Sequence, residues 1–253
     1  MILKNLLRRR TRTILTVVGI SVGVAAVVAL GAIADGFTAQ LTGMLTRGGT
    51  DLTVVQDKVA DVGLSAVDEE VGERIAAIPG VANVSGVLFS VVPAPGTPYF
   101  MVFGYDPKQY AIRHFKIVKG QQLSGERQII IGNTAAGYMK KKVGDMLKLQ
   151  DSSFRIVGIY QTGVGYEDGG AVITLKDAQA MFKKPRQVGL LQVRVRDRDR
   201  IDEIERRIAT SFKGIRVSRS GDFVESTQDI KVTRSIARSS SLRTGSSPLR
   251  VLW

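Results

Sequence analysis

The residues that most resemble catalytic machinery lie near the N-terminus. Gly19-Ile20-Ser21-Val22-Gly23 matches the G-x-S-x-G nucleophile pattern. That pattern supports acyl transfer only when the serine follows a strand, opens a helix and has a histidine base nearby. Here the serine lies inside a long apolar run, which argues against a nucleophile. The only histidine of the chain, His114, lies in a polar stretch and is predicted to be a surface residue.

Metal and nucleotide chemistry lacks its usual ligands. The chain has no cysteine and one histidine, which excludes the usual zinc sites, and it has no G-x-x-x-x-G-K-[ST] phosphate loop. The run GVGYEDGG, residues 163–170, resembles a binding loop but lacks G-x-G-x-x-G spacing. It is predicted to be a flexible hairpin or lobe-edge loop, with contact to a partner as the alternative. We therefore predict no catalytic residue, no cofactor, no metal ligand and no enzymatic activity.

Four alternating arginines could in principle bind phosphates: Arg194, Arg196, Arg198 and Arg200. Five acidic residues accompany them: Asp197, Asp199, Asp202, Glu203 and Glu205. No aromatic residues interleave for base stacking, as they do in proteins that bind single-stranded nucleic acid. The pattern therefore predicts a solvated, salt-bridged face and no nucleic-acid partner.

The net charge of +13 is concentrated at the two ends of the chain. Residues 1–13 contain five basic residues and no acid, and residues 231–253 repeat that count. The rest of the chain is nearly neutral. Basic segments beside an apolar run are typical of the cytoplasmic flanks of a membrane protein.

The apolar run between Ile14 and Ala34 is 21 residues long. A helix of that length spans roughly 30 Å, the thickness of the hydrocarbon core of a bilayer. We predict a transmembrane helix over 14–34, with residues 1–13 as a basic cytoplasmic segment and the body outside. A cleaved signal peptide is the alternative, because Ala32-Ile33-Ala34 has the shape of a cleavage site.

Small residues at four-residue spacing within this run let another helix approach closely. Gly19 and Gly23 form one such pair, and Ser21, Ala25 and Ala29 follow at the same spacing. The predicted helix–helix packing residues are Gly19, Gly23 and Ala25. Beyond Asp35 the apolar residues continue at helical spacing and stop at Gly48-Gly49. Residues 35–49 are therefore predicted to form a stalk.

The body, from residue 50 onward, reads as an α+β fold. Residues 50–105 predict β-α-β-β, with Ser65 capping a helix whose first turn holds Asp68 and Glu69. Residues 188–222 predict β-α-β, and the two pieces together predict one split ferredoxin-like, or porter-like, lobe. Residues 106–187 contain short strands and two helices and predict a β-rich inserted lobe.

Several of these segments resemble one family, the MacB/FtsX-type ABC-transporter permeases. The most specific residues are Arg12-Thr13-Ile14-Leu15-Thr16 followed by GISVGVAAV, residues 19–27. The resemblance extends over residues 3 to 237. Four further segments carry it: GQQLSGERQIIIGNTAA, VGDMLKLQDSSFRIVGIYQTG, AVITLKDAQAMF and VRVRDRDRIDEIERRI.

The resemblance implies a bacterial inner-membrane permease with a cytoplasmic N-terminus and a periplasmic core between its first and second of four transmembrane helices. It implies a cytoplasmic ABC ATPase partner, a homodimer or paired permease, and a possible periplasmic adaptor or substrate. Four basic residues match the family's segment at the membrane surface beside the ATPase: Lys4, Arg8, Arg9 and Arg12.

The end of the chain departs from the family pattern. After Ala237, where a second transmembrane helix is expected, the sequence reads RSSSLRTGSSPLRVLW. We expect residues 223–253 to be a return segment and a disordered tail, from a truncation or frameshift before the later helices.

Two functions remain open from the sequence. The first is a permease subunit that transmits ATPase motion to an extracytoplasmic core, for efflux, lipoprotein release or mechanical signalling. The second is a single-pass membrane-anchored extracytoplasmic binding or adaptor module. A secreted enzyme, cleaved after Ala34, is disfavoured because no catalytic set is visible.

Overall fold

The computed structural model describes residues 10–46, 49–59 and 62–220. The chain forms two compact units, which divide between Leu41 and Thr42. Lys4, Arg8, Arg9 and the predicted tail 223–253 lie outside the described residues.

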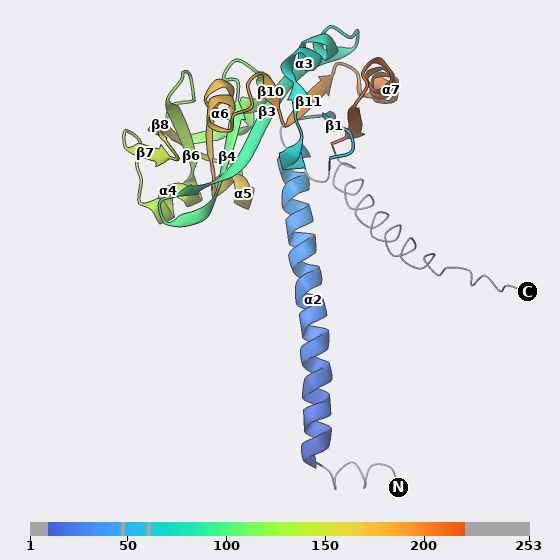
Figure 1. Cartoon of the computed structure of the whole chain (residues 1–253), viewed down its shortest axis with the longest axis vertical. Helices are drawn as coiled ribbons and strands as arrows, with labels where there is room; N and C mark the ends of the chain where they lie inside the picture. Colours follow the sequence, from blue (N-terminus) through green and yellow to red (C-terminus); the bar gives the residue numbers. More distant parts are fainter. Residues whose placement is uncertain (1–9, 47–48, 60–61, 221–253) are drawn as a thin grey trace, which may run out of the picture. The chain divides into compact units, whose positions relative to one another are not determined.

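The first element is a single helix, α2, which runs from Arg10 to Thr46 over 37 residues (Figure 1). It continues without a break through Asp35 and Gly36, as the predicted span and stalk require. Large apolar side chains are exposed on every side of it between Ile14 and Leu30. Within it, the 21 residues Arg12–Ala32 are long and apolar enough to cross a membrane. A helix that is apolar all round suits lipid better than water.

The body is built on one ten-stranded sheet. Its strands are β1 (Leu52–Gln56), β3 (Val81–Ala94), β4 (Thr97–Tyr105), β5 (Lys116–Gly120), β6 (Gln128–Gly132), β7 (Met146–Leu149), β8 (Ser152–Gln161), β9 (Ala171–Thr174), β11 (Leu190–Val195) and β12 (Ile215–Arg219). Their order is β12-β1-β11-β3-β4-β9-β6-β8-β5, and β7 also pairs with β8. A small second sheet joins β2 (Val67–Asp68) to β10 (Gln187–Val188).

Five helices and three 3-10 turns accompany the sheets in the described part of the body. The helices are α3 (Glu69–Ala76), α4 (Asn133–Met139), α5 (Gly165–Asp168), α6 (Leu175–Met181) and α7 (Ile201–Ser211). The 3-10 turns are η1 (Val62–Leu64), η2 (Tyr110–His114) and η3 (Arg198–Arg200).

Strands β12, β1, β11 and β3 are adjacent and antiparallel although they come from opposite ends of the body sequence. Helices α3 and α7 contribute Ile75, Ile204 and Ile208 to the core that contains Leu52 and Leu191. With the partly buried Val71 and Ile201, these helix residues form one apolar stripe on each helix, and burying that stripe holds the helix on the sheet.

The inserted segment continues the same sheet. Strand β4 pairs in parallel with β9, with Phe103 opposite Val172. Gly104 permits the close packing of α6 above this pair, because a Cβ there would collide with the Cβ of Ala178. The sheet is thus continuous across the predicted boundary at residues 105 and 106, and the division into two lobes stays a prediction.

The predicted N-cap of the first body helix is wrong. Asp68 caps α3, and its carboxylate accepts a hydrogen bond from the amide of Glu70 at 2.9 Å. Ser65 instead accepts from the amide of Gln56 at 3.0 Å, and strand β2 (Val67–Asp68) directly precedes α3. A backbone pairing with β10, distant in sequence, therefore overrides the local capping signal.

Candidate functional site

The predicted packing residues lie on the exposed surface of α2. A Cβ added at Gly19 or Gly23 would meet no atom within 4 Å, and Ala25 is exposed as well. Arg12 lies on the first turns of the same helix. Their roles in helix packing and at the membrane surface stay predictions.

The described body has a distinctive feature where the chain enters and leaves the sheet. The chain enters at Gly49 to Asp51 and its described part ends at Ser220, beside the entry. The amide of Ser220 donates to the carbonyl oxygen of Asp51 at 3.0 Å. The hydroxyls of Thr53 and Ser220 share a 3.1 Å hydrogen bond and are buried. We call Gly49, Thr50, Asp51, Thr53, Tyr110, Arg194, Arg198 and Ser220 the entry–exit junction.

Asp51 is the centre of this junction, and its side chain is only 7% exposed. Its amide donates to Val193 at 3.0 Å, which continues the β1–β11 ladder. One carboxylate oxygen accepts from the amide of Val195 at 2.9 Å, and the other lies 3.2 Å from Nε of Arg198. Hydrogen bonds to a charged group are stronger than neutral ones. Asp51 therefore ties the entry of the chain to β11 and to the turn that begins α7.

Arg194 holds the residue before Asp51. Its Nε donates to the carbonyl oxygen of Gly49 at 3.0 Å, and its guanidinium lies 4.7 Å from the ring centre of Tyr110. The Tyr110 hydroxyl lies 3.4 Å from Thr50 Oγ1, and burial raises the pKa of this phenol. Gly49 has a φ of +69°, and a Cβ there would collide with the Arg194 guanidinium. The junction therefore needs glycine at this position.

The predicted solvated arginine face is confirmed for Arg196, Arg198 and Arg200, which are exposed, whereas Arg194 is partly buried. Arg194 and Arg196 donate to backbone carbonyl oxygens, of Gly49 at 3.0 Å and of Val81 at 3.2 Å. Arg198 pairs with Asp51, which lies outside the predicted set of acids. Arg200 forms the expected kind of pair, with Glu203 at 2.9 Å. The alternation of a strand directs the first two arginines along the sheet, where backbone acceptors at strand ends are close.

His114 is not the predicted surface residue. Its side chain is 9% exposed, and its Nε2 lies 2.7 Å from a carboxylate oxygen of the buried Glu167. Phe115 and Tyr160 pack nearby, and the Tyr160 hydroxyl donates to the carbonyl oxygen of Glu167 at 2.6 Å. Sequence patterns could not indicate this pair, because 53 residues separate its two members.

The glycine-rich segment 163–170 contains a one-turn helix, α5 (Gly165–Asp168), and forms no hairpin, so of the two predicted forms only the lobe-edge loop remains. The Asp168 carboxylate accepts from the amides of Thr162 at 2.7 Å and Gly163 at 3.0 Å, which fixes the approach to the helix. A shallow pocket of about 390 Å³ lies beside this segment. Its lining includes Gly165, Tyr166 and Gly169 of the segment, together with Tyr99 and Tyr138.

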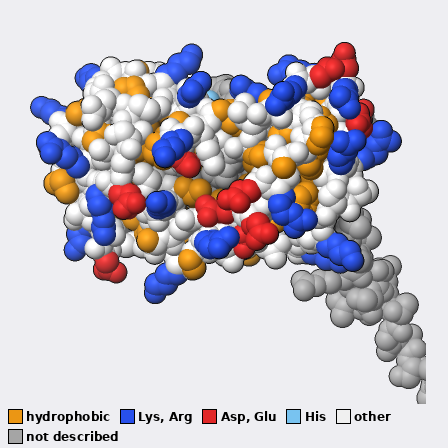
Figure 2. Space-filling view, turned by 90° about the horizontal axis from the view of Figure 1, so that it is seen from above, with side chains coloured by type: hydrophobic (Ala, Val, Ile, Leu, Met, Phe, Trp, Pro, Cys, Tyr) orange, Lys and Arg blue, Asp and Glu red, His pale blue; other side chains and the backbone are white. Residues whose placement is uncertain are grey.

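Charges of both signs are interspersed over the face of the body seen in Figure 2. Acidic and basic side chains alternate there without a broad field of one sign. This distribution differs from the continuous basic surface that neutralises a nucleic-acid backbone.

Three comparisons place the chain among known proteins. The model of the MacB-like periplasmic core domain matches residues 13–211. An uncharacterized ABC transporter permease of Methanocaldococcus jannaschii is 26% identical over 227 residues, which cover 83% of this chain. The chain spans only 56% of the length of that relative.

Two solved structures share the fold. The periplasmic region of MacB from Actinobacillus actinomycetemcomitans aligns with a TM-score of 0.54 at 10% identity, covering 72% of this chain and 94% of that one. The extracellular domain of the noncanonic ABC-type transporter YknZ from Gram-positive bacteria aligns with a TM-score of 0.52 at 14% identity, covering 67% and 98%. The family match includes both the apolar helix and the sheet body, and the chain therefore belongs to the MacB-like periplasmic core domain family.

Proposed function

We propose that this chain belongs to the permease subunit of a MacB/FtsX-type ABC transporter. The observation that carries the proposal is the continuous family match over residues 13–211, which joins an apolar helix to a sheet body of the same kind. A cytoplasmic ABC ATPase subunit would hydrolyse ATP, and this chain would transmit the resulting motion to the body outside the membrane.

Charge and the fold support the proposed orientation. The basic residues before the apolar helix favour a cytoplasmic N-terminus in the inner membrane. The body would then lie outside, as the names of the MacB and YknZ domains state for those proteins. The strand order β12-β1-β11-β3 with helices α3 and α7 supports the split ferredoxin-like unit as the part of the body nearest to its entry and exit points.

Transmission of motion requires firm attachment where the chain enters the body. The entry–exit junction would supply this attachment, because the single residue Asp51 is bonded to three parts of the body. Its partners are strand β11, the Arg198 side chain and, through its carbonyl oxygen, the amide of Ser220. A force applied at Gly49 would therefore act on β11 and on the end of β12 as well as on β1. Homodimerisation or permease pairing through Gly19, Gly23 and Ala25, and a periplasmic adaptor, are further parts of the proposal.

The test is co-purification. The membrane protein that carries this chain is expressed with an ABC ATPase encoded beside it, extracted in mild detergent and reconstituted in nanodiscs. The proposal expects a stoichiometric complex whose ATPase rate exceeds that of the ATPase alone. A chain that enters the membrane, leaves its N-terminus inside and binds no ATPase would instead support the anchored adaptor module.

A further inference from the structure

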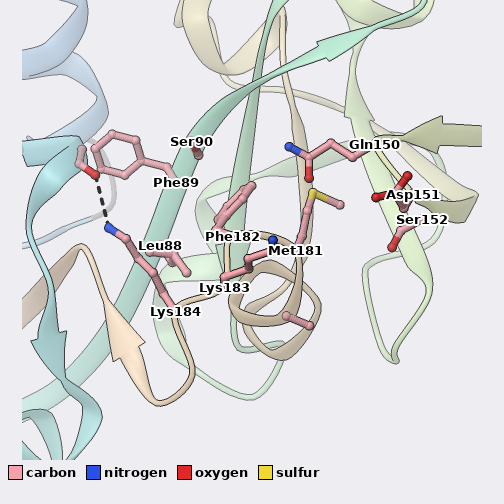
Figure 3. A pocket seen from close by; sticks show the side chains of 12 residues that line it. Leu88, Phe89, Ser90, Gln150, Asp151, Ser152, Met181, Phe182, Lys183 and Lys184 are labelled. Atoms are coloured by element: carbon pink, nitrogen blue, oxygen red, sulfur yellow. Dashed lines mark hydrogen bonds between the residues drawn. The ribbon is translucent and has the colours of Figure 1, made fainter.

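A hollow on the body lies beside the C-terminal end of α6 (Figure 3). Its volume is about 680 Å³, within the roughly 300–1,000 Å³ of pockets that hold small molecules. Its walls come from four places in the sequence: Gly63 of η1, strand β3, the connection from β7 into β8, and residues 180–184. None of these residues belongs to the entry–exit junction.

One wall of this pocket is apolar. Leu88, Phe89, Met181 and Phe182 form it, and Leu88 is fully buried beneath the others. Figure 3 shows Phe182 and Met181 between Leu88 and Gln150, so both side chains border the open space. Phe182 and Met181 remain partly exposed there, and an apolar ligand would remove that surface from water. Methionine adapts its shape to different apolar ligands.

The rim of the pocket carries two adjacent lysines, Lys183 and Lys184, and one acid, Asp151. The ammonium of Lys184 donates to the carbonyl oxygens of Gly63 at 3.4 Å and Ser65 at 3.3 Å (dashed line in Figure 3 for Gly63). Among the described residues, no carboxylate lies within ion-pair distance of either lysine. The rim therefore has a positive excess next to an apolar wall.

Lysines at a helix C-terminus are ordinary, because they oppose the negative end of the helix. That explanation covers their position but not the apolar hollow beside them. Lys183 also has a φ of +55°, so the turn after α6 places it by a specific backbone conformation. Ser90, Gln150 and Ser152 add neutral hydrogen-bonding groups to the opposite wall.

We propose that this pocket binds a small amphiphilic anion, with one acidic group at Lys183 and an apolar body against Met181 and Phe182. An ammonium binds a carboxylate or phosphate by charge-assisted hydrogen bonds, and the apolar wall selects a ligand with a hydrophobic tail over an inorganic ion. The inference is independent of the proposed transport function, because it concerns binding to the body alone.

The test uses the full chain in nanodiscs of neutral phospholipid. The probe is dansylamino-undecanoic acid, a fluorescent anionic amphiphile, and its methyl ester is the matched neutral probe. Empty nanodiscs measure partition into lipid. The proposal expects saturable fluorescence with the acid that exceeds the empty-disc signal, competition by decanoate and little competition by decanol.

Variants locate the site. Lys183→Gln is expected to weaken binding of the acid about tenfold or more, whereas Lys183→Arg retains it. Lys142→Gln, at an exposed lysine outside the pocket, is the matched control and leaves binding unchanged. Ser90→Trp fills the hollow and abolishes binding, and an unchanged thermal unfolding midpoint shows that it still folds.

Two lipid compositions distinguish the sources of the ligand. Competition by phosphatidylglycerol in the disc would assign a membrane lipid as the occupant, and its absence would assign a soluble amphiphile. Equal binding of the acid and its ester, or equal binding by wild type and Lys183→Gln, would overturn the proposal. A signal that does not exceed that of empty nanodiscs would do the same.

Discussion

Thr53 and Ser220 share a 3.1 Å hydrogen bond between their hydroxyls, although 167 residues separate them in the sequence. The bond closes the body at the place where the chain enters it and where its described part ends. Thr53 lies on β1, the strand between β12 and β11, so both ends of the body are joined to the middle of one antiparallel unit. The two ends of the body are thus bonded directly to each other.

Asp51→Asn is expected to destabilise the body by about 1–2 kcal/mol. The change keeps the size of the side chain but weakens its bonds to the Val195 amide and to Arg198. Urea unfolding of the detergent-solubilised chain measures the effect. The matched control is Asp199→Asn on the exposed η3 turn, which is expected to change stability by less than about 0.5 kcal/mol. Equal effects of the two variants would argue against a central role for Asp51.

Gly49→Ala is expected to cost more than the ordinary penalty of a positive φ. Left-handed backbone costs a residue with a Cβ about 1–2 kcal/mol, and here the Cβ would also displace the guanidinium of Arg194. Gly214→Ala is the matched control, because its φ is +77° and no atom lies within 4 Å of its added Cβ. The loss of unfolding free energy in Gly49→Ala minus that in Gly214→Ala measures the contribution of Arg194. No difference would show that Arg194 moves aside without loss.

His114→Ala is expected to destabilise the body by about 3 kcal/mol or more. The change removes the partner of a carboxylate that is buried at 1% exposure, and an unpaired buried charge is costly. His114→Gln, which retains a hydrogen-bond donor, is expected to recover part of the loss. Thermal unfolding is expected to rank the wild type as most stable, His114→Gln next and His114→Ala last. A His114→Ala chain as stable as the wild type would contradict this ranking.

The body is expected to lose stability in alkali. Burial, followed by the nearby Glu167 carboxylate, raises the pKa of Tyr105 and the pKa of Tyr160 well above the ordinary value of 10.0. The folded state therefore holds these protons more tightly than the unfolded state. Their contribution is complete below about pH 10 and is lost as the pH rises above it. Unfolding free energies from pH 8 to 11 check the direction, and Tyr105→Phe is expected to reduce the alkaline loss.

Much of the fold could be predicted from the sequence because its signals are local. The apolar run predicted α2, and the stripes that contain Ile75, Ile204 and Ile208 predicted α3 and α7. Helix periodicity and strand alternation depend only on near neighbours. The continuous sheet through β4 and β9 could not be predicted, because strand partners distant in sequence leave no local pattern.

The entry–exit junction and the His114–Glu167 pair could not be predicted from sequence patterns. The sequence around Asp51 gives no sign of its role, because its partners lie at residues 193–198 and at Ser220. Asp68 caps α3 in place of the expected Ser65, and His114 pairs with Glu167. In both cases the partner or the competing strand pairing is distant in sequence. Polar residues act here through tertiary contacts, whereas their spacing in sequence carries little information about those contacts.

The central claim is that ATP turnover by a partner subunit moves this body, and one distance measurement tests it most directly. The chain has no native cysteine, so one spin label is placed at the exposed Lys142 in each copy of the reconstituted permease–ATPase complex. Electron–electron double resonance then gives the distance between the two labels without nucleotide and after trapping with ATP and vanadate. The account predicts that the distance distribution shifts on trapping and that Asp51→Asn reduces the shift. Identical distributions in the two states, in a complex that hydrolyses ATP, would contradict it.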